Sequence, residues 1–544
     1  MANQATDFPI PADLEGFWIW DRLHCPRTLA PLEHELLVGS TGIGFTQAIG
    51  EMGSGIIAVC KMFNYYAYLS GVARPLEPGE TQEQRNQRYE QSVAALKPVI
   101  GAKWQNEWLP AMKPELERVR NVDYSRYSDA GLLQRFAEMQ GEVVHRWYIH
   151  GLLLYSFAAA NDFSDFYKEH ISEGSSMEGY EALQGFETEA TKSSRGLWNL
   201  SRKVRANPEL LPLFENAGAG QILKDLNNSD AGRAFLGELN VYLKDYGWRA
   251  DSVYELTQAS WWENPAIPLG AIQGFVSIGD DAGPESQLAS AIKRREELLA
   301  DARSKLSGNA SLLQQFNDLY AAAESFTPIV EDHNHWIDQM GDIAMRYPCL
   351  EFGKRLVARG LLNAVDDVFL LYVAEVTDAM GGKDFRSVVD QRKADKAQFQ
   401  KLVPPPVMGI PQPPSGDPVE DVLVRFFGAP VEPSADASVL AGIAASPGVV
   451  TGTAKVVRSL DEASKLQQGD IMVCEMTLPP WTPLFSTVSA VVADTGGILS
   501  HCAIVAREYR IPCVVGTAVG TITIKDGQRL TVDGSKGIVR IESR

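Results

Sequence analysis

A proline-rich stretch near residue 402 divides the chain and limits what can fold on either side of it. Residues 402–418 read LVPPPVMGIPQPPSGDP and contain the prolines Pro404, Pro405, Pro406, Pro411, Pro413, Pro414 and Pro418. Proline lacks an amide proton and clashes with the preceding helical turn, so no helix can run through this stretch, and extended polyproline II is favoured. Such a spacer could reach roughly 50 Å. The sequence therefore predicts a flexible linker at 402–437 between a domain at 1–401 and a domain at 438–544.

The part of the chain before the linker is predicted to be mostly α-helical. Apolar residues recur at three- and four-residue steps, as a one-sided helix requires, in 131–140, 144–157, 289–306 and 311–326. Strand signals are sparse, and 272–278 (IQGFVSI) is the best of them. We expect one large, mostly helical domain.

The part after the linker has a different pattern. Short β-branched runs occur at 449–457, 471–474, 489–493, 513–515, 521–525 and 537–541. Turn signals such as Asp526-Gly527 and Asp533-Gly534 separate the later runs, and this alternation is typical of a compact α/β module. The predicted fold class is therefore a multi-domain protein with a large α-helical domain and a small α/β domain.

The charge balance excludes some partners. The chain has 50 Lys and Arg residues against 69 Asp and Glu residues, a formal charge of −19, which argues against nucleic acid because phosphate neutralisation needs a basic surface. No apolar run approaches the ~20 residues that span a bilayer, and the first residues show no signal-peptide pattern, so no membrane partner is expected. The six cysteines form no CxxC pair, which favours a reducing compartment. We expect a cytoplasmic protein.

The segment around His501 has the strongest chemical signal. A predicted strand at 489–493 leads into Gly496-Gly497, and Ser500 then begins a predicted helix whose first turn contains His501. A helix N-terminus has unpaired amide protons and a positive dipole end, which suit a phosphoryl group. A neutral imidazole placed there could act as a nucleophile and divide one transfer into two easier steps. The alternative is a histidine that caps the helix for packing reasons.

This segment resembles a known family. TGGILSHCAIVAREYRIPCVVG is similar to the signature of the swivelling phosphohistidine domain of phosphoenolpyruvate-utilising enzymes, and GIAASPGVVTGTAKVV, DIMVCEMTLPPWTPLF and LTVDGSKGIVRI match its flanks in order. The resemblance implies that His501 carries the phosphoryl group, with Ser500, Gly497 and Arg507 as phosphate-binding residues. Arg510 stands where the family usually has glycine, which puts the local backbone geometry in doubt.

Other segments narrow the resemblance. TLPPWTPLF at 477–485, together with 17–32, 246–265 and 331–339, is similar to phenylphosphate synthase and methylphenylphosphate synthase and to the C-terminal two-thirds of rifampin phosphotransferase. The resemblance implies that 1–401 is an acceptor-binding domain. Those enzymes also use an ATP-grasp domain, which has no counterpart here.

Nucleotide-binding motifs are not found in the sequence. There is no GxxxxGK[ST] loop, and the GxG pairs at Gly42-Gly44 and Gly218-Gly220 lack the third glycine of the dinucleotide pattern. The expected partner is therefore an ATP-grasp-type nucleotide-binding subunit. The resemblance implies that this subunit binds Mg-ATP and releases AMP and phosphate, and that this chain itself binds no cofactor.

Transfer to a hydroxyl needs a base near the O–H and cations near the phosphoryl group. His333, with Asp332 beside it, is the candidate base. His333 and His335 are two residues apart on a predicted helix and would point about 200° apart, so no metal site is expected. The candidate cations are Arg249, Arg346 and Arg355, and each is as well suited to a surface ion pair.

The acceptor pocket is expected to be aromatic, because an apolar pocket with a few polar groups suits a phenol. The candidate substrate-binding residues are His24, Trp20, His145, His150 and Trp336. For each of them taken singly, the ordinary role of a core residue is favoured.

The preferred hypothesis is a phosphotransferase subunit that phosphorylates phenol or a methylphenol through phospho-His501. Three alternatives stay open. The acceptor could be the hydroxyl of a rifamycin-like antibiotic. The chain could be a phosphocarrier in a protein relay, or it could be a scaffold in which His501 is vestigial.

Overall fold

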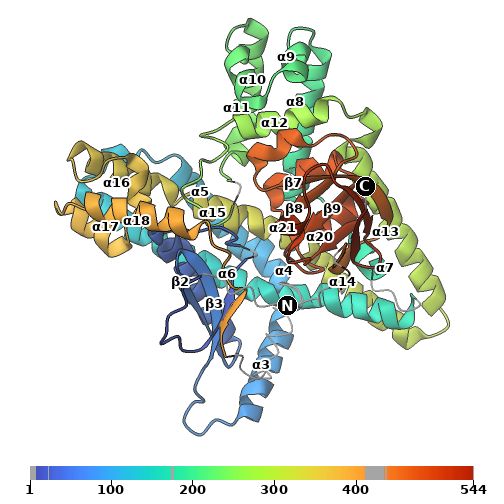
Figure 1. Cartoon of the computed structure of the whole chain (residues 1–544). Coiled ribbons are helices and arrows are strands. Elements are labelled where there is room, and N and C mark those ends of the chain that lie inside the picture. Colours follow the sequence, from blue (N-terminus) through green and yellow to red (C-terminus); the bar gives the residue numbers. More distant parts are fainter. Residues whose placement is uncertain are drawn as a thin grey trace. The chain divides into compact units, whose positions relative to one another are not determined.

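The computed structural model describes residues 8–22, 24–172, 177–250, 252–410, 434, 436 and 438–542 (Figure 1). The chain divides into two compact units. Unit 1 comprises 1–155, 252–259 and 336–420, and unit 2 comprises 156–251, 260–335 and 421–544. The region predicted as one helical domain is therefore shared between both units, and unit 2 also contains the α/β module.

Unit 1 combines helices with a small antiparallel sheet. Its helices are α1 (Pro31–Glu33), α2 (Gly39–Glu51), α3 (Gln82–Leu96), α4 (Ile100–Lys103), α5 (Leu109–Arg120), the first part of α6 (Asp129–His170), α15 (Met340–Ile343), α16 (Arg346–Ala358), α17 (Val373–Met380) and α18 (Arg386–Phe399). Its strands are β1 (Phe17–Trp20), β2 (Ile56–Phe63), β3 (Tyr66–Ala73) and β4 (Val407–Gly409), in the order β2-β3-β1-β4.

The sequence patterns did not predict this sheet. Strands β2 and β3 form a hairpin in which Phe63 pairs with Tyr66. The two loop residues, Asn64 and Tyr65, have φ values of 50° and 69°, as a type I′ turn requires. Asparagine tolerates this conformation, but a tyrosine beside it is not a turn signal. The hairpin was missed for that reason.

The predicted linker begins as ordered chain. Strand β4 pairs antiparallel with β1, and the hydroxyl of Tyr68 donates to the carbonyl of Pro405 at 2.8 Å. A proline-rich segment can join a sheet at its edge, because an edge strand needs only half of its amide protons. Residues 402–409 thus belong to unit 1. Residues 411–433 lie outside the described part of the chain, and a swing of the linker stays a prediction.

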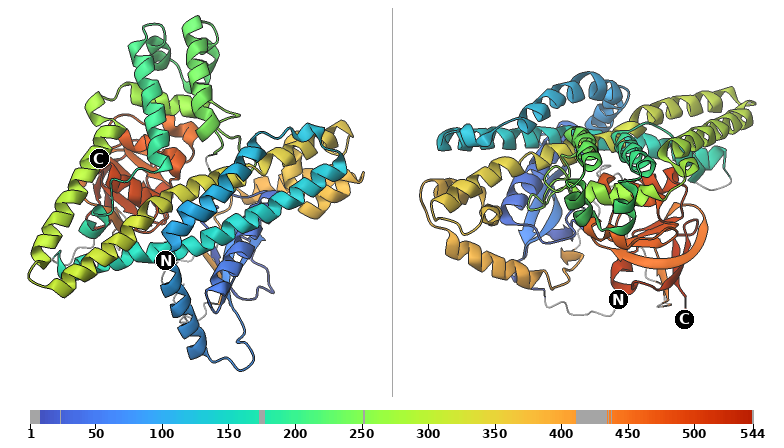
Figure 2. Two further views of the ribbon diagram at one scale, coloured as in Figure 1. Left: turned by 180° about the vertical axis from the view of Figure 1, so that it is seen from behind. Right: turned by 90° about the horizontal axis from the view of Figure 1, so that it is seen from above.

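The helical part of unit 2 consists of α7 (Met177–Glu181), α8 (Glu189–Ala206), α9 (Leu211–Asn216), α10 (Ala219–Leu226), α11 (Asp230–Tyr246), α12 (Ala266–Val276), α13 (Pro284–Leu306) and α14 (Ala310–His333). The long helices α13 and α14 lie side by side (Figure 2). The strand signal at 272–278 was wrong: most of it belongs to α12, where Leu269, Ile272 and Phe275 are buried at helical spacing. Among the described helices, none is long and apolar enough to cross a membrane.

The α/β module forms the rest of unit 2. Its elements are β5 (Val439–Ala441), β6 (Ile443–Ser446), β7 (Val449–Val457), β8 (Ile471–Cys474), β9 (Ala490–Ala493), α20 (His501–Glu508), β10 (Cys513–Val515), α21 (Gly520–Thr523), β11 (Arg529–Asp533) and β12 (Ile538–Ile541). The sheet order is β5-β12-β11-β7-β8-β9-β10-β6. Strands β7, β8, β9 and β10 are mutually parallel, and every residue of β8 and β9 is buried, as parallel strands covered on both faces require. The predicted fold class is confirmed.

The C-terminal end of α20 carries unusual backbone strain. Arg510 has φ +52°, and the amide of Ile511 donates to the carbonyl of Ala506 at 3.0 Å, which completes a helix-ending motif that normally uses glycine. The Arg510 guanidinium also donates to the carbonyl of Ser290. Arg510, which stands where the family usually has glycine, thus has a left-handed backbone conformation.

Arg510→Gly is expected to stabilise the module. Left-handed backbone costs a non-glycine residue roughly 1–2 kcal/mol, which glycine avoids. The greater flexibility of glycine in the unfolded chain offsets about 0.5–1 kcal/mol of this gain. Thermal unfolding should show a higher midpoint for Arg510→Gly and a lower one for Arg510→Ala, which keeps the strain and loses the side chain. Equal destabilisation by both variants would contradict this explanation.

Candidate functional site

His501 lies at the carboxyl end of the parallel strands. Strand β9 ends at Ala493, and the chain passes through a glycine turn before α20 begins at His501. Gly496 has φ +99°, and a Cβ there would lie 2.7 Å from Oγ of Ser500, so only glycine fits. Ligands of open α/β sheets bind where parallel strands end and helices begin, and the amide protons of the first helical turn point outwards there.

Two side chains hold the His501 ring in unit 2. Its Nδ1 lies 2.8 Å from Oε2 of Glu331, at the end of α14, and its Nε2 lies 3.3 Å from Oγ1 of Thr482. A carboxylate only accepts hydrogen bonds, so Nδ1 carries the proton and the lone pair is on Nε2. The side chains of His501 and Glu331 are only 10% and 7% exposed, so this hydrogen bond is largely shielded from water. A ring in this tautomer has the lone pair that a nucleophilic nitrogen needs, on Nε2.

The other phosphate-binding candidates of the module surround the start of α20. Ser500 is the N-cap residue, and its buried Oγ has no hydrogen-bond partner among the described residues. The carbonyl of Gly497 accepts from the amide of Ser500 at 3.1 Å. The Arg507 guanidinium donates to the carbonyls of Ala445 and Ile498 at 2.8 and 3.0 Å. Arg507 therefore stabilises the turn before His501 through these two hydrogen bonds. The hydroxyl of Ser500 is available to a ligand.

Acidic groups near this site have raised pKa values. Removal from water raises the pKa of Glu508 to about 8, and the Glu331 carboxylate adds to this rise while Arg507 opposes it. Burial likewise raises the pKa of Asp332 to about 7, although the hydrogen bond from the amide of Glu189 opposes this rise. The surroundings of His501 therefore hold less negative charge at neutral pH than the residue types suggest.

The candidate base and its neighbour follow Glu331 on α14. Nδ1 of His333 lies 2.9 Å from the carbonyl oxygen of Ile329, and a carbonyl can only accept, so the Nε2 of His333 carries the lone pair. Asp332 accepts from the amide of Glu189 at 2.7 Å and caps α8. With the lone pair on Nε2, His333 can accept a proton, as a base must. Its spacing of two residues from Glu331 turns it to another side of the helix.

Arg249 is a buried cation in the same unit. It is 1% exposed, and its guanidinium contacts Nδ1 of His335 at 2.9 Å and Oγ of Ser193 at 3.3 Å. The rings of Tyr246 and Trp261 lie 5.4 and 5.2 Å from its Cζ atom. Burial lowers its pKa. A guanidinium has only donors, so His335 keeps its proton on Nε2.

The other two arginine candidates have structural partners in unit 1. Arg355 donates to Glu351 and Asp129, both at 2.9 Å, and to three backbone carbonyls. The buried Arg346 donates to the carbonyl of Leu256 and lies against the ring of Phe369. These contacts support the ion-pair and packing alternative for both residues.

The substrate candidates belong to unit 1, and two of them pair with carboxylates. Nδ1 of His24 lies 2.9 Å from Oδ1 of Asp21, and its ring packs against Tyr254 with centroids 5.9 Å apart. Burial lowers the pKa of His24, but the charge and hydrogen bond of Asp21 outweigh this effect and the pKa is raised overall.

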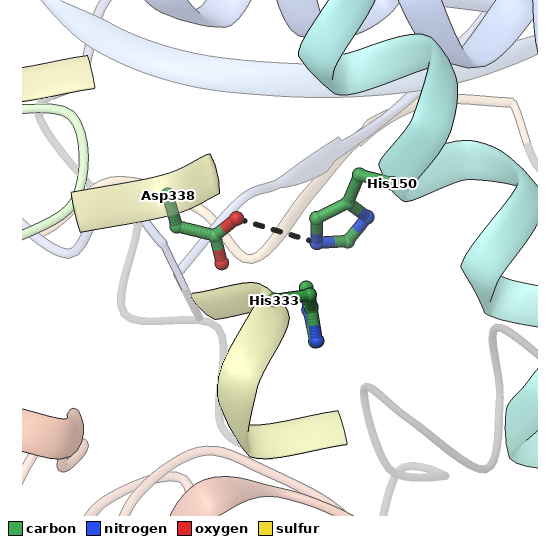
Figure 3. Close-up of side chains that lie close together, drawn as sticks. All are labelled: His150, His333 and Asp338. Atoms are coloured by element: carbon green, nitrogen blue, oxygen red, sulfur yellow. Dashed lines mark ion pairs between the residues drawn. The ribbon is translucent and has the colours of Figure 1, made fainter. Parts of the chain in front are cut away.

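His150 is the other paired candidate. Its Nε2 lies 3.6 Å from Oδ1 of Asp338 (Figure 3), and its ring centroid lies 4.6 Å from that of Trp147. The indole of Trp147 donates to Asp342 at 3.3 Å, whose pKa is raised well above its usual range by burial and by Asp338. Figure 3 also draws His333, which ends α14 in unit 2. Unit 1 thus has an interior that is both aromatic and acidic.

The remaining three candidates are less enclosed or lie in a structural core. Trp20 packs against Tyr66 in the small core of the antiparallel sheet. His145 is exposed and stacks on Tyr148. Trp336 is half-buried, with Nζ of Lys113 4.6 Å from its ring centroid.

Two residues that contact the His501 ring, Glu331 and Thr482, were not predicted from the sequence as site residues. Both lie inside segments that carry the family resemblance, but neither was singled out. The available signal was a carboxylate directly before the candidate base, and a hydroxyl between Trp481 and Pro483. Neither signal says which distant residue the side chain meets.

Comparisons with known proteins agree with this geometry. Residues 466–537 match the family described as "PEP-utilising enzyme, mobile domain", and residues 152–329 match "Rifampicin phosphotransferase fourth domain". The chain is 32% identical to chondramide synthase cmdD of Chondromyces crocatus, a match that covers 98% of this chain and 14% of that protein. It is 28% identical to the uncharacterised phosphotransferase YvkC of Bacillus subtilis, covering 98% of this chain and 62% of the relative.

A further relative is a rifampicin phosphotransferase of Bacillus cereus, 27% identical over 63% of this chain and 39% of that protein. The chain thus spans between 14% and 62% of the length of these curated relatives. As the sequence resemblance predicted, the chain contains a mobile domain of the phosphoenolpyruvate-utilising enzymes and a region that matches the fourth domain of rifampicin phosphotransferase.

Proposed function

We propose that this chain is the phosphohistidine and acceptor-binding part of a phosphotransferase, and that it passes a phosphoryl group through His501 to the hydroxyl of a small aromatic molecule. One observation carries the proposal. His501 stands at the start of α20 with Nδ1–H held by Glu331, so that Nε2 has the lone pair. A pure packing role would not require a buried carboxylate on one ring nitrogen and a hydroxyl on the other.

Two displacements at phosphorus make up the proposed reaction. In the first, the Nε2 lone pair of His501 forms an N–P bond while the bond from phosphorus to the leaving group of the donor breaks. In the second, the acceptor oxygen forms a P–O bond, the N–P electron pair returns to Nε2, and the hydroxyl proton passes to a base. Each step is a nucleophilic displacement, and Glu331 stabilises the positive charge of the ring while the N–P bond exists.

His333 is our proposed base for the second step. Its Nε2 has the lone pair because Nδ1 donates to Ile329, and Asp332, whose pKa is raised to about 7, is the adjacent group that can share a proton near neutral pH. Arg249 is the proposed cation, since it is buried and the groups that it contacts, His335 and Ser193, are neutral.

The phosphoryl donor is proposed to be Mg-ATP, bound by a separate ATP-grasp-type subunit and cleaved to AMP and phosphate. Support comes from the sequence, in which the usual nucleotide loops are not found.

Two acceptor classes are supported by different observations. The aromatic interior of unit 1, with Trp147, Tyr254 and the paired His24 and His150, favours a phenol or a methylphenol. The match of 152–329 to a rifampicin phosphotransferase domain favours a larger antibiotic hydroxyl. Phenols are our first candidate and rifamycins are the second.

A two-step assay tests the proposal. The full chain is phosphorylated with phosphoramidate, a small chemical donor that needs no partner, and is then mixed with phenol, the methylphenols or a rifamycin. We expect loss of phosphate from His501 to be faster with a phenol, with formation of the aryl phosphate. His333→Gln should slow this step about 100-fold without slowing loading. Transfer to the rifamycin alone would select the second candidate, and transfer to neither class would contradict acceptor phosphorylation by this chain.

A further inference from the structure

A cavity lies where the end of α20 packs on the helical part of unit 2. Its volume is about 410 Å³, and it is partly open to solvent. Glu508 and Tyr509 line it from the end of α20, Ser194 and Arg195 from α8, and Gln287 from the start of α13. The cavity therefore lies in the surface through which the α/β module docks on the helices of the same unit.

Glu508 and His501 belong to one face of α20. They are the last and the first residue of this helix, seven positions apart, which is close to two turns. Nδ1 of His501 lies 2.8 Å from Oε2 of Glu331 on α14, and the hydroxyl of Tyr509 lies 3.4 Å from Oγ of Ser194 on α8. The docked face of α20 thus has the nucleophile at one end and a carboxyl group at the other.

In the described part of unit 2, little stabilises a charge on the Glu508 carboxyl. No hydrogen bond reaches it from the described residues. Arg195 lines the same cavity, but its guanidinium lies 2.7 Å from Glu187 and 3.5 Å from Glu285. Arg507, the neighbour on α20, donates to two backbone carbonyls. A charge that is removed from water needs hydrogen bonds or a close opposite charge, and both nearby guanidinium groups are already paired.

Docking therefore favours the neutral carboxyl. Removal from water and the charge of Glu331 raise the pKa of Glu508 to about 8, and Arg507 opposes this rise. Gln287 is uncharged, and the phenol of Tyr509 stays protonated because burial raises its pKa. A glutamate in water has a pKa of roughly 4.3. Docking thus takes up a proton, and it weakens as the pH rises from roughly 4.3 to about 8.

We propose that Glu508 is a proton-operated switch of docking, which lets the module pack on α8 and α13 when its carboxyl is protonated and favours release of the module when the carboxyl is ionised. Release exposes the carboxylate to water, which solvates its charge. The same step exposes His501, whose docked side chain is only 10% exposed. The switch acts on docking and not on bond formation, so it goes beyond the proposed reaction and does not require it.

Single-molecule energy transfer between two dyes tests this switch in the full chain. The dyes are attached at Lys293→Cys on α13 and Lys536→Cys in the module, where the lysine side chains are 79% and 74% exposed. Cys60→Ser removes the one cysteine that is not buried. From about pH 6 to pH 8, the ratio of docked to released molecules should fall by up to about 10-fold per pH unit, the linkage of one proton. In Glu508→Gln, whose amide does not titrate, the ratio should stay within about 2-fold of the wild-type value at the lower pH.

Two further variants complete this experiment. Glu296→Gln is the matched control, because Glu296 is exposed on α13 and its loss should leave the pH dependence of the wild type. Glu508→Met, which is neutral and similar in length, replaces Glu508→Gln if that variant does not fold. A wild-type ratio that does not change with pH, or the same change in a chain without the carboxyl, would overturn the switch.

Loading of His501 with phosphoramidate is the second measurement. Since the docked ring is largely enclosed, the reagent is expected to react with released molecules. The loading rate of the wild type divided by that of Glu508→Gln should rise by up to about 100-fold over the same two pH units, and the pH dependence of phosphoramidate itself cancels in this quotient. A constant quotient would overturn the switch. Failure of both chains to be loaded would overturn the proposed function, while the energy-transfer ratios would still decide on the switch.

Discussion

His501→Asn is expected to abolish phosphoryl transfer, with turnover at least about 10⁴-fold below that of the wild-type chain, because the nitrogen that forms the N–P bond is lost. Asparagine is chosen since its amide N–H can replace Nδ1–H as the donor to Glu331, so the change removes the nucleophile and keeps the Glu331 carboxylate hydrogen-bonded. The variant should fold and should bind acceptor as the wild type does.

Intact mass at neutral pH checks this result. The wild-type chain should gain one acid-labile phosphoryl group on His501 when it is incubated with Mg-ATP and a lysate of its host, and His501→Asn should gain none. His145→Asn is the matched control, because His145 is exposed and should not affect loading. Turnover that survives in His501→Asn would exclude the carrier mechanism and favour direct transfer.

Glu331→Gln is expected to lower the rates of loading and transfer about 100-fold. The neutral amide can still accept from Nδ1–H of His501, but it cannot stabilise the positive charge on a ring that carries a phosphoryl group, and its NH₂ group can select the wrong tautomer. Acceptor affinity should be unchanged, so the effect should appear in kcat and not in KM.

Glu331→Gln also has a readout that activity does not provide. The Glu331 carboxylate helps to raise the pKa of Glu508 to about 8, so the uncharged glutamine should lower the pKa of Glu508. A carbon NMR titration of the side-chain carboxyl would measure this shift. Glu324→Gln is the matched control, since Glu324 lies on the same helix, is exposed and accepts from Tyr320. An unchanged pKa of Glu508 would mean that Glu331 does not face the module in solution.

The two variants should not be additive. His501 and Glu331 act on the same atoms of one imidazole, so the double variant should be no slower than His501→Asn alone. A further loss in the double variant would show that Glu331 has a second role elsewhere in the reaction.

Local patterns were sufficient for much of the fold and failed where pairing is distant. Buried β-branched runs and short turns predicted the α/β module, and helical periodicity predicted α13 and α14. The hairpin of β2 and β3 was missed because its turn contains Tyr65, which is not a turn signal. The rest of the sheet is not local either: β3 pairs with β1, and β1 pairs with β4, which lies more than 330 residues after the hairpin. The segment 272–278 was assigned to a strand because a short apolar run fits either a strand or a buried helix, and only packing distinguishes them.

By itself the sequence determined that His501 begins a helix after a strand and a glycine turn, because strand, turn and cap are all set by residues within about ten positions of one another. Only the tertiary structure decided which ring nitrogen is the nucleophile. That choice depends on Glu331, 170 positions earlier, and on Thr482, which contacts the ring from the 3-10 helix Pro479–Ser486. Periodicity predicts which side chains share a face of a helix, but it does not predict which distant side chains will contact that face. The tautomer of a histidine depends on such a tertiary contact.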